Sequence, residues 1–409
     1  MRELIRRTFR SLRVRNFRIF FIGQFVSSVG LWMQQVAELW LVADLTSSAT
    51  AVGLITVAHF GPVLLFGLWG GVVADRLDKR RLLLVTQALL ATIAAGLAIV
   101  SATGGVTVGI LYGFAAATGL VQAVDNPARR AFIREMVDRA NVSNAVSLVS
   151  MVFTSSRIVG PAITGVLLVA TGPTIVFAVN ALSYGGVLTA LLLMRVRELH
   201  TFPPVPRAPG QLLEGLRYSW ANTGVRLPLV MMVWIGTLAF NFTVLLVLFA
   251  EQTFDAGPGG YGTLLSLSAI GSLSGALVAA ARHRITRRFL VNAAMGFGVM
   301  TVIASTAPTL ITMALLLIPV GVFGVAFLSG SQGAMQEAAG PHMQGRVMAL
   351  FAVVFLGGTP IGGMFAGLVS EVWGPRVAFA IGGVVSLATG FWAWRVGRSQ
   401  IPAVEPAPT

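Results

Sequence analysis

The chain has 409 residues, of which 56% are hydrophobic and only 11% are charged, and its formal net charge is +14. A soluble domain is about 25% charged, and a protein this apolar could not cover itself with polar surface. The hydrophobicity excludes a disordered chain, and the lack of cysteine excludes a disulfide scaffold. What remains is a protein that crosses a membrane several times.

Twelve apolar stretches, each about 20 residues or longer, follow one another along the chain. A stretch of this length can cross the hydrocarbon core as a helix. Helix is expected because lipid offers no hydrogen-bond partner to the backbone. The predicted spans are 17–43, 51–74, 82–101, 106–124, 144–170, 174–194, 227–250, 260–281, 288–306, 309–333, 347–370 and 376–395. The sequence therefore predicts an all-α membrane protein.

The positive charges mark one side of the predicted membrane. Of the 29 lysines and arginines, all except Arg157 and Arg376 lie before the first span or after an even-numbered span. Cytoplasmic loops are enriched in Lys and Arg, so both termini are expected in the cytoplasm. We therefore expect a multi-pass protein of the plasma or inner cell membrane.

Residues 1–16 form a basic segment with an apolar side. A full-length span follows without a clear cleavage site, which argues against a cleavable signal peptide. The segment is expected to lie as an amphipathic helix on the anionic inner leaflet of the lipid bilayer. Nucleic-acid binding is the other interpretation of a basic arm, and it is not favoured here.

The longest internal polar segment, 196–226, contains four prolines and is predicted to be a stiff cytoplasmic linker. It separates two groups of six spans, at 17–195 and 227–395, and residues 396–409 are expected to form a cytoplasmic tail. The halves resemble each other, since Gly67-x3-Gly71 recurs as Gly271-x3-Gly275. Transporters are often built from such repeats, with substrate bound between them.

The link after the second span reads Gly71-Val-Val-Ala-Asp75-Arg76-Leu-Asp-Lys-Arg80-Arg. It resembles the signature loop of the major facilitator superfamily, and Gly71, Asp75, Arg76 and Arg80 match. Asp78 stands where the family usually has Gly, and Lys79 where Arg is usual. The resemblance implies a major facilitator fold of twelve transmembrane helices in two six-helix halves. It also implies a cytoplasmic latch, meaning contacts of this loop that hold the outward-facing state.

The carboxylate of Asp75 is expected to contact the start of the eleventh span and either Arg129 or Arg130. These contacts would have to break when the cytoplasmic side opens. The alternative interpretation is an ordinary positively charged inner loop.

The fifth span contains Gly160-Pro161-x-x-Thr164-Gly165. It resembles the antiporter motif of superfamily drug exporters, in which Gly160, Pro161 and Gly165 match and Thr164 replaces a glycine. Ordinary small-residue packing is the alternative. Further stretches resemble the enterobactin-exporter and macrolide-efflux branch, which favours export; they include Asn16-Phe17-Arg18, Trp40-Leu41-Val42, Asn126-Pro127-Ala128-Arg129 and Gly345-Arg346-Val347.

Two titratable residues lie within adjacent spans. Glu38 is in the outer third of the first span and His59 is in the second, so antiparallel packing places them at similar depth. Intramembrane ionisable groups are candidates for function, and a carboxyl beside an imidazole is suited to proton exchange. Glu38 could instead contact outer water, and His59 could be a hydrogen-bonded packing residue. Gln34 is a further candidate for lining a cavity.

Arg157 is the one cation in the interior of a predicted span, away from its ends. It must face protein or a wet cavity. It could bind an anionic substrate, pair with a carboxylate such as Glu38, or tether two spans. Asp125, before Asn126-Pro127, is interpreted as the end of the fourth span.

No ATP site is expected, because the sole lysine, Lys79, is followed by Arg and a Walker A loop needs Gly-Lys-Ser/Thr. No metal or other cofactor is predicted either. The predicted function is a monomeric, proton-coupled efflux pump that works by alternating access on hydrophobic or amphipathic organic compounds, such as drugs or siderophores. An uptake permease for an organic solute or lysolipid is the alternative. A membrane-integral enzyme is less favoured, because only Glu38 and His59 come near to a catalytic cluster.

Overall fold

The computed structural model describes residues 9–200, 211–282, 284–340 and 343–396. The first eight residues of the predicted amphipathic segment, part of the predicted linker and almost all of the predicted tail lie outside these ranges. In the described part of the chain, twelve helices are long and apolar enough to cross a membrane. The predicted all-α fold with twelve transmembrane helices is therefore confirmed.

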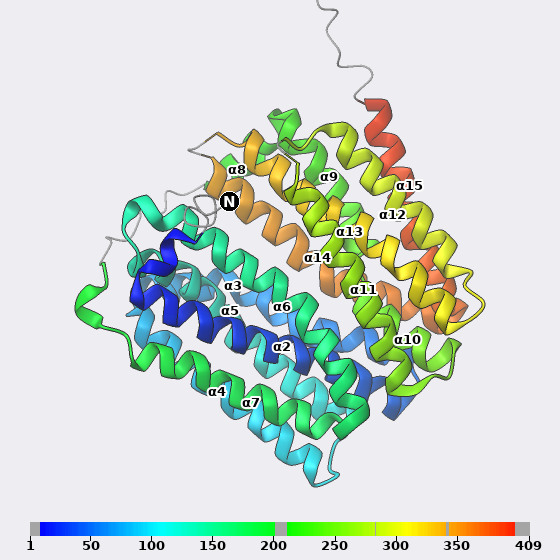
Figure 1. The fold of residues 1–409 in the computed structure, drawn as a ribbon, viewed down its shortest axis with the longest axis horizontal. Coiled ribbons are helices and arrows are strands. Elements are labelled where there is room, and N and C mark those ends of the chain that lie inside the picture. The colour runs from blue at the N-terminus through cyan, green and yellow to red at the C-terminus, as the bar shows by residue number, and fades with distance from the viewer. Residues whose placement is uncertain (1–8, 201–210, 283, 341–342, 397–409) are drawn as a thin grey trace, which may run out of the picture.

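The first six spans are single helices (Figure 1). They are α2 (Arg15–Thr46), α3 (Ala49–Arg76), α4 (Lys79–Ala102), α5 (Val108–Met136), α6 (Val142–Thr171) and α7 (Pro173–Leu192). Short 3₁₀ turns at Arg10–Arg13, Arg139–Asn141 and Val196–Glu198 flank them, and α8 (Gln211–Ala221) leads into the second half.

The seventh span is interrupted. It consists of α9 (Thr223–Leu238), α10 (Phe242–Leu248) and the π-helical η4 (Phe249–Thr253). At the interruption, the Asn241 side chain donates to the backbone oxygen of Thr237 at 2.8 Å. The remaining spans are α11 (Gly257–Ala280), α12 (Arg287–Ser305), α13 (Leu310–Ala338), α14 (Gln344–Trp373) and α15 (Pro375–Val396).

Local sequence explains where these helices begin and turn. The side chains of Ser48 and Asp78 accept hydrogen bonds from the first-turn amides of α3 and α4, as N-caps do. Asp78 is the residue at which the loop departs from the superfamily pattern, and here it caps α4. Gly172 and Gly374 have φ of 77° and 83°, a region that favours glycine, and each precedes a proline that opens the next span.

The two halves meet along two helix pairs, α3 with α14 and α6 with α11. Glycines allow both close approaches: Gly53 faces Gly363 and Gly367, and Gly165 faces Gly262, with no room for a Cβ on either side. Small residues of this kind let helix backbones pack closely within membranes.

We name the two ends of the bundle by their residues. The basic end is where α3 finishes at Arg76 and α4 begins at Lys79; the far end is where α2 finishes and α3 begins. At the far end, Glu371 of α14 accepts hydrogen bonds from the Ser48 hydroxyl at 3.1 Å and from the Thr50 amide at 2.9 Å. Contacts between the halves thus hold the far end together.

The glycine repeat predicted from the sequence is only partly confirmed. Gly271 and Gly275 of α11 lie directly against the backbone of α13. In the first half the corresponding close contact, of α3 with α5, is made by Gly70, whereas Gly67 has nothing within 4 Å of a Cβ position. In the first half, Gly70 and not Gly67 therefore makes the close helix contact.

Candidate functional site

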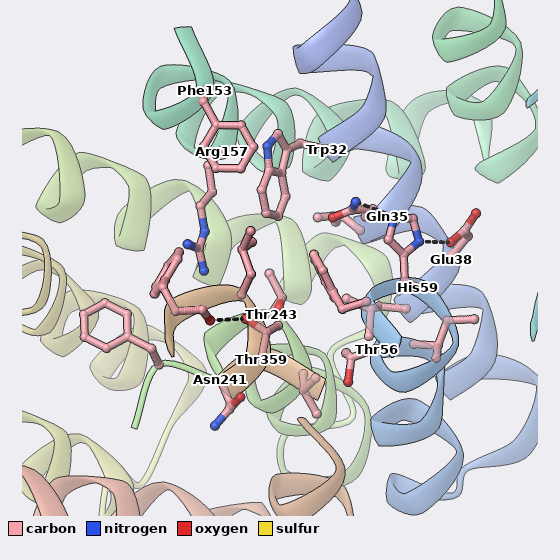
Figure 2. Close-up of a pocket in the computed structure, with 18 residues that line it drawn as sticks. Trp32, Gln35, Glu38, Thr56, His59, Phe153, Arg157, Asn241, Thr243 and Thr359 are labelled. Atoms are coloured by element: carbon pink, nitrogen blue, oxygen red, sulfur yellow. Dashed lines mark hydrogen bonds and ion pairs between the residues drawn. The ribbon is translucent and has the colours of Figure 1, made fainter. Parts of the chain in front are cut away.

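A pocket lies between the two halves near the middle of the spans (Figure 2). The first half contributes residues of α2, α3 and α6, and the second half contributes residues of α10 and α14 and of the break before α10. Its volume is about 50 Å³, whereas pockets for drug-sized ligands measure roughly 300–1,000 Å³. The conformation described here therefore encloses a narrow central site that must widen to admit an organic compound.

Glu38 and His59 lie together at one side of this pocket, as Figure 2 shows. Their side chains are 1% and 3% exposed, and Glu38 Oε2 lies 3.9 Å from His59 Nδ1. The structure thus brings together two residues that the sequence placed at similar depth. Among the described residues, no Lys or Arg lies within ion-pair distance of Glu38.

A chain of amides fixes the orientation of Glu38. Asn180 of α7 donates to Gln34 at 2.6 Å, and Gln34 donates to Glu38 Oε1 at 2.7 Å. Gln34 is 1% exposed and is not a lining residue of the pocket. It therefore orients the Glu38 carboxylate from the side that faces away from the pocket.

The hydrogen bonds of His59 define its tautomer. Gln35 Nε2 lies 2.7 Å and Gln122 Nε2 lies 3.4 Å from His59 Nε2. An amide nitrogen only donates, so Nε2 must accept, and the proton of a neutral ring is on Nδ1. This places the ring proton on the side that faces Glu38. Nδ1 is buried without a hydrogen-bond partner, so a movement of about one ångström would let Nδ1–H donate a hydrogen bond to an ionised Glu38, and this contact would be lost when Glu38 takes up a proton.

Arg157 of α6 lies on another side of the pocket, away from Glu38 (Figure 2). Its guanidinium is 5.3 Å from the ring centre of Trp32 and 4.8 Å from that of Phe355. Trp32 belongs to the first half and Phe355 to the second, so the cation contacts both halves. The predicted alternative of a salt bridge to Glu38 is not formed; of the predicted roles, anion binding and tethering remain.

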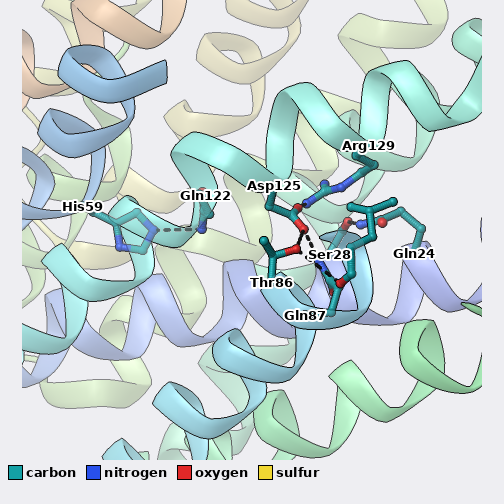
Figure 3. Close-up of polar contacts among 9 residues, drawn as sticks. Gln24, Ser28, His59, Thr86, Gln87, Gln122, Asp125 and Arg129 are labelled. Atoms are coloured by element: carbon teal, nitrogen blue, oxygen red, sulfur yellow. Dashed lines mark hydrogen bonds and ion pairs between the residues drawn. The ribbon is translucent and has the colours of Figure 1, made fainter. Parts of the chain in front are cut away.

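Asp125 is not the end of a span, which corrects the interpretation of the sequence. Helix α5 continues through Pro127 to Met136, and Asp125 is 0% exposed within it. Its carboxylate accepts from Thr86 at 2.7 Å and from Gln87 at 2.8 Å, and it pairs with Arg129 (Figure 3). A buried carboxylate with these partners can lie inside a helix, which hydropathy alone does not reveal.

The residues predicted to form the latch lie at the basic end. Gly71 is buried, Asp75 and Arg76 are exposed, and Arg80 donates to the backbone oxygen of Leu191 at 2.8 Å. Arg129, a predicted partner of Asp75, is instead paired with Asp125. Arg130 is the neighbouring cation on α5, and it is exposed.

The antiporter-like segment of α6 packs through its small residues. Gly160 lies against Trp32 and the backbone of α2, and Gly165 lies against Gly262 of α11. Pro161 is inside the helix, and the Thr164 hydroxyl donates to Gly160 O at 2.9 Å and to Met33 O at 3.3 Å. This segment therefore joins α6 to its own half and to the opposite half.

Several lining residues could not be singled out from the sequence. They are Thr56, Phe153, Thr243, Phe355 and Thr359. Threonines and phenylalanines are frequent in apolar spans, so these residue types do not by themselves indicate which positions line a pocket. Gln35 and Asn241, polar groups in or near spans, are lining residues as well.

Two six-helix halves around a central pocket with a few polar groups define a transporter of the major facilitator type. Residues 6–408 match the model of the transmembrane secretion effector family, and the chain belongs to that family. The superfamily predicted from the loop after the second span and from the motif in the fifth span is thereby confirmed, and the chain is a transporter and not an enzyme.

Similar proteins include transporters and efflux pumps. The staphyloferrin A transporter of Staphylococcus aureus is 22% identical over 376 residues, covering 90% of this chain and 93% of the relative. The multidrug efflux pump Tap of Mycolicibacterium fortuitum is 28% identical over 361 residues, covering 84% and 86%. A solved bacterial homologue of the lysosomal transporter Spinster, in an inward-facing and unoccupied conformation, has a TM-score of 0.72 at 15% identity, covering 95% and 98%.

Proposed function

We propose that this chain exports hydrophobic or amphipathic organic compounds from the cell in exchange for protons. The observation that carries the proposal is the buried Glu38–His59 pair in the pocket between the halves, with 3.9 Å between its nearest polar atoms. A group that binds and releases a proton at the substrate pocket can link protonation to the shape of that pocket. The relative described as a multidrug efflux pump supports export as the direction.

The orientation follows from the charges. We place the basic end, the linker 196–226 and both termini in the cytoplasm, because cytoplasmic loops are enriched in Lys and Arg. The far end, where Glu371 joins α14 to α3, then faces outward. In this arrangement the described conformation is closed toward the outside, as it has to be when an exporter collects its substrate.

Alternating access then requires the far end to open and the basic end to close. The halves 17–195 and 227–395 would rock about the pocket, separating Gly53 from Gly363 and Gly165 from Gly262. The latch of Gly71, Asp75, Arg76 and Arg80 would form at the basic end in the outward-facing state. Proton entry supplies the driving force, at about 2.3 kcal/mol for each charge that crosses 100 mV.

The test is transport by the purified protein in proteoliposomes that contain no ATP, with a panel of organic cations, anions and neutral amphiphiles. A pH gradient imposed in one direction and then reversed should drive the same compound in opposite directions. A proton antiporter moves the compound against proton flow. Movement in the same direction as protons would indicate an uptake permease, and transport insensitive to the gradient would contradict the proposal.

A further inference from the structure

Among the described residues, no carboxylate pairs with the cation in the pocket. Arg157 makes its recorded contacts with two aromatic rings, and in the described part of the chain it forms no hydrogen bond or ion pair. The titratable side chains that line the pocket with it are Glu38 and His59. Those two face each other, and Glu38 is further held by Gln34.

The aromatic contacts do not offset the cost of placing this charge within the membrane. A cation–π contact contributes about 0.5–2 kcal/mol, depending on how far it is desolvated. Removing a charged group from water costs several kcal/mol even after relaxation. Arg157 is only partly exposed, so the two ring contacts and the pocket replace only part of the hydration of a free guanidinium, and an anion that entered the pocket would supply the missing partner. A tether between helices would need no charge at this position, because an apolar side chain would pack against the same rings.

The aromatic rings around Arg157 restrict the chemical class of anion that can bind there. Trp32 and Phe355 flank the guanidinium, and Phe153 packs edge-on against Trp32 with 6.0 Å between ring centres. These rings offer apolar contact to a planar or aliphatic body, while guanidinium recognises carboxylate, sulfonate or phosphate groups through paired N–H donors. The ligand that fits is an amphipathic organic acid and not a small inorganic anion.

The two charged sites of the pocket are separate. Figure 2 shows Arg157 and the Glu38–His59 pair on different sides, with uncharged residues such as Thr243 and Thr359 between them. A ligand held by Arg157 would therefore leave Glu38 free to bind and release a proton. A cationic substrate, in contrast, would have to approach Glu38 directly and would be repelled by Arg157.

We infer that Arg157, framed by Trp32 and Phe355, is an anion-binding subsite, and that the transported compounds are amphipathic organic acids. That these compounds are transported rests on the proposed function. The existence of the subsite depends only on whether the protein binds such anions. It can therefore be tested at equilibrium, without a membrane gradient.

The experiment uses two dyes with the same xanthene ring system and opposite charge, fluorescein as the anion and rhodamine 6G as the cation. Binding to the purified full chain in detergent is followed by fluorescence anisotropy. The wild-type protein should bind fluorescein at least about tenfold more tightly than rhodamine 6G. That ratio corresponds to about 1.4 kcal/mol.

Three variants separate charge from structure. Arg157→Gln should weaken fluorescein binding about tenfold and leave rhodamine 6G binding unchanged or improved. Arg157→Lys keeps the charge but not the paired N–H donors, so it should retain part of the fluorescein binding, and it guards against a folding defect in the first variant. Arg288→Gln removes an exposed arginine at the start of α12, and should behave like wild type.

Wild-type affinity for fluorescein in Arg157→Gln would overturn the inference, as would failure of the wild-type protein to bind fluorescein or a preference for rhodamine 6G. The proposed function fails by a different result, which is gradient-insensitive transport in proteoliposomes. If dye binding depends on Arg157 but transport does not respond to the pH gradient, the anion subsite is supported and proton coupling is rejected.

Discussion

Glu38 and Asp125 are two buried carboxylates of the first half, and their surroundings are opposite in kind. Asp125 has a hydroxyl, an amide and the guanidinium of Arg129 as partners, and none of its atoms lines the pocket. Glu38 has one amide and a titratable imidazole 3.9 Å away, and it lines the pocket. Equal burial therefore does not indicate equal function. A carboxylate with a permanent counter-ion stabilises the fold, whereas one that faces a titratable group can change its charge.

The largest expected effect is on stability. Asp125→Asn removes the counter-ion of Arg129 and leaves its guanidinium, which is 14% exposed, without a charge partner. Breaking a buried ion pair in this way costs about 3–5 kcal/mol. The measurement is equilibrium or thermal unfolding of the purified protein in detergent.

Glu38→Gln is the matched control, because it makes the same chemical change at a carboxyl of equal burial. It should alter the free energy of unfolding by less than about 1 kcal/mol, since Gln34 can hydrogen-bond an amide as well. The double variant Asp125→Asn with Arg129→Met should recover part of the lost stability. If Asp125→Asn were as stable as Glu38→Gln, the distinction between the two carboxylates would be wrong.

The next effect concerns the latch. Asp75→Ala should leave expression and unfolding unchanged but reduce transport about tenfold, because the outward-facing state loses about 1.4 kcal/mol of stabilisation. Initial rates in proteoliposomes measure this. Asp138→Ala, at an exposed carboxylate near the same end, is the control. Full transport by Asp75→Ala would show that this loop is an ordinary positively charged link and not a latch.

The smallest effect is at the far end. Glu371→Ala removes the side chain that caps the start of α3 from the opposite half, and a lost cap costs about 1 kcal/mol. The population of the closed far end should fall about fivefold. Spin-label distances between α3 and α14 would report this, with Asp44→Ala, an exposed carboxylate of α2, as the control. An unchanged distance distribution would show that the cap does not hold the far end closed.

The sequence was sufficient for the fold because lipid imposes one simple pattern. Apolar runs gave the spans, and the depth of Glu38 and His59 in adjacent antiparallel spans predicted their proximity. Hydropathy did not predict that α5 continues past Asp125, because two of the three partners of that carboxylate lie on α4, 38 and 39 residues away. Nor could it pair Arg157 with Phe355, since that contact depends on how the two halves pack.

The link that we propose is between protonation of Glu38 and movement of the substrate. It is tested most directly by comparing two kinds of transport in proteoliposomes carrying wild type, Glu38→Gln or Asp125→Asn. One is transport driven by a pH gradient, and the other is exchange of labelled for unlabelled substrate at equal pH. Glu38→Gln should lose the first and keep the second, because a carboxamide cannot carry the proton but the pocket is intact. Asp125→Asn protein that remains folded should keep both. Gradient-driven transport by Glu38→Gln at the wild-type rate would contradict the account.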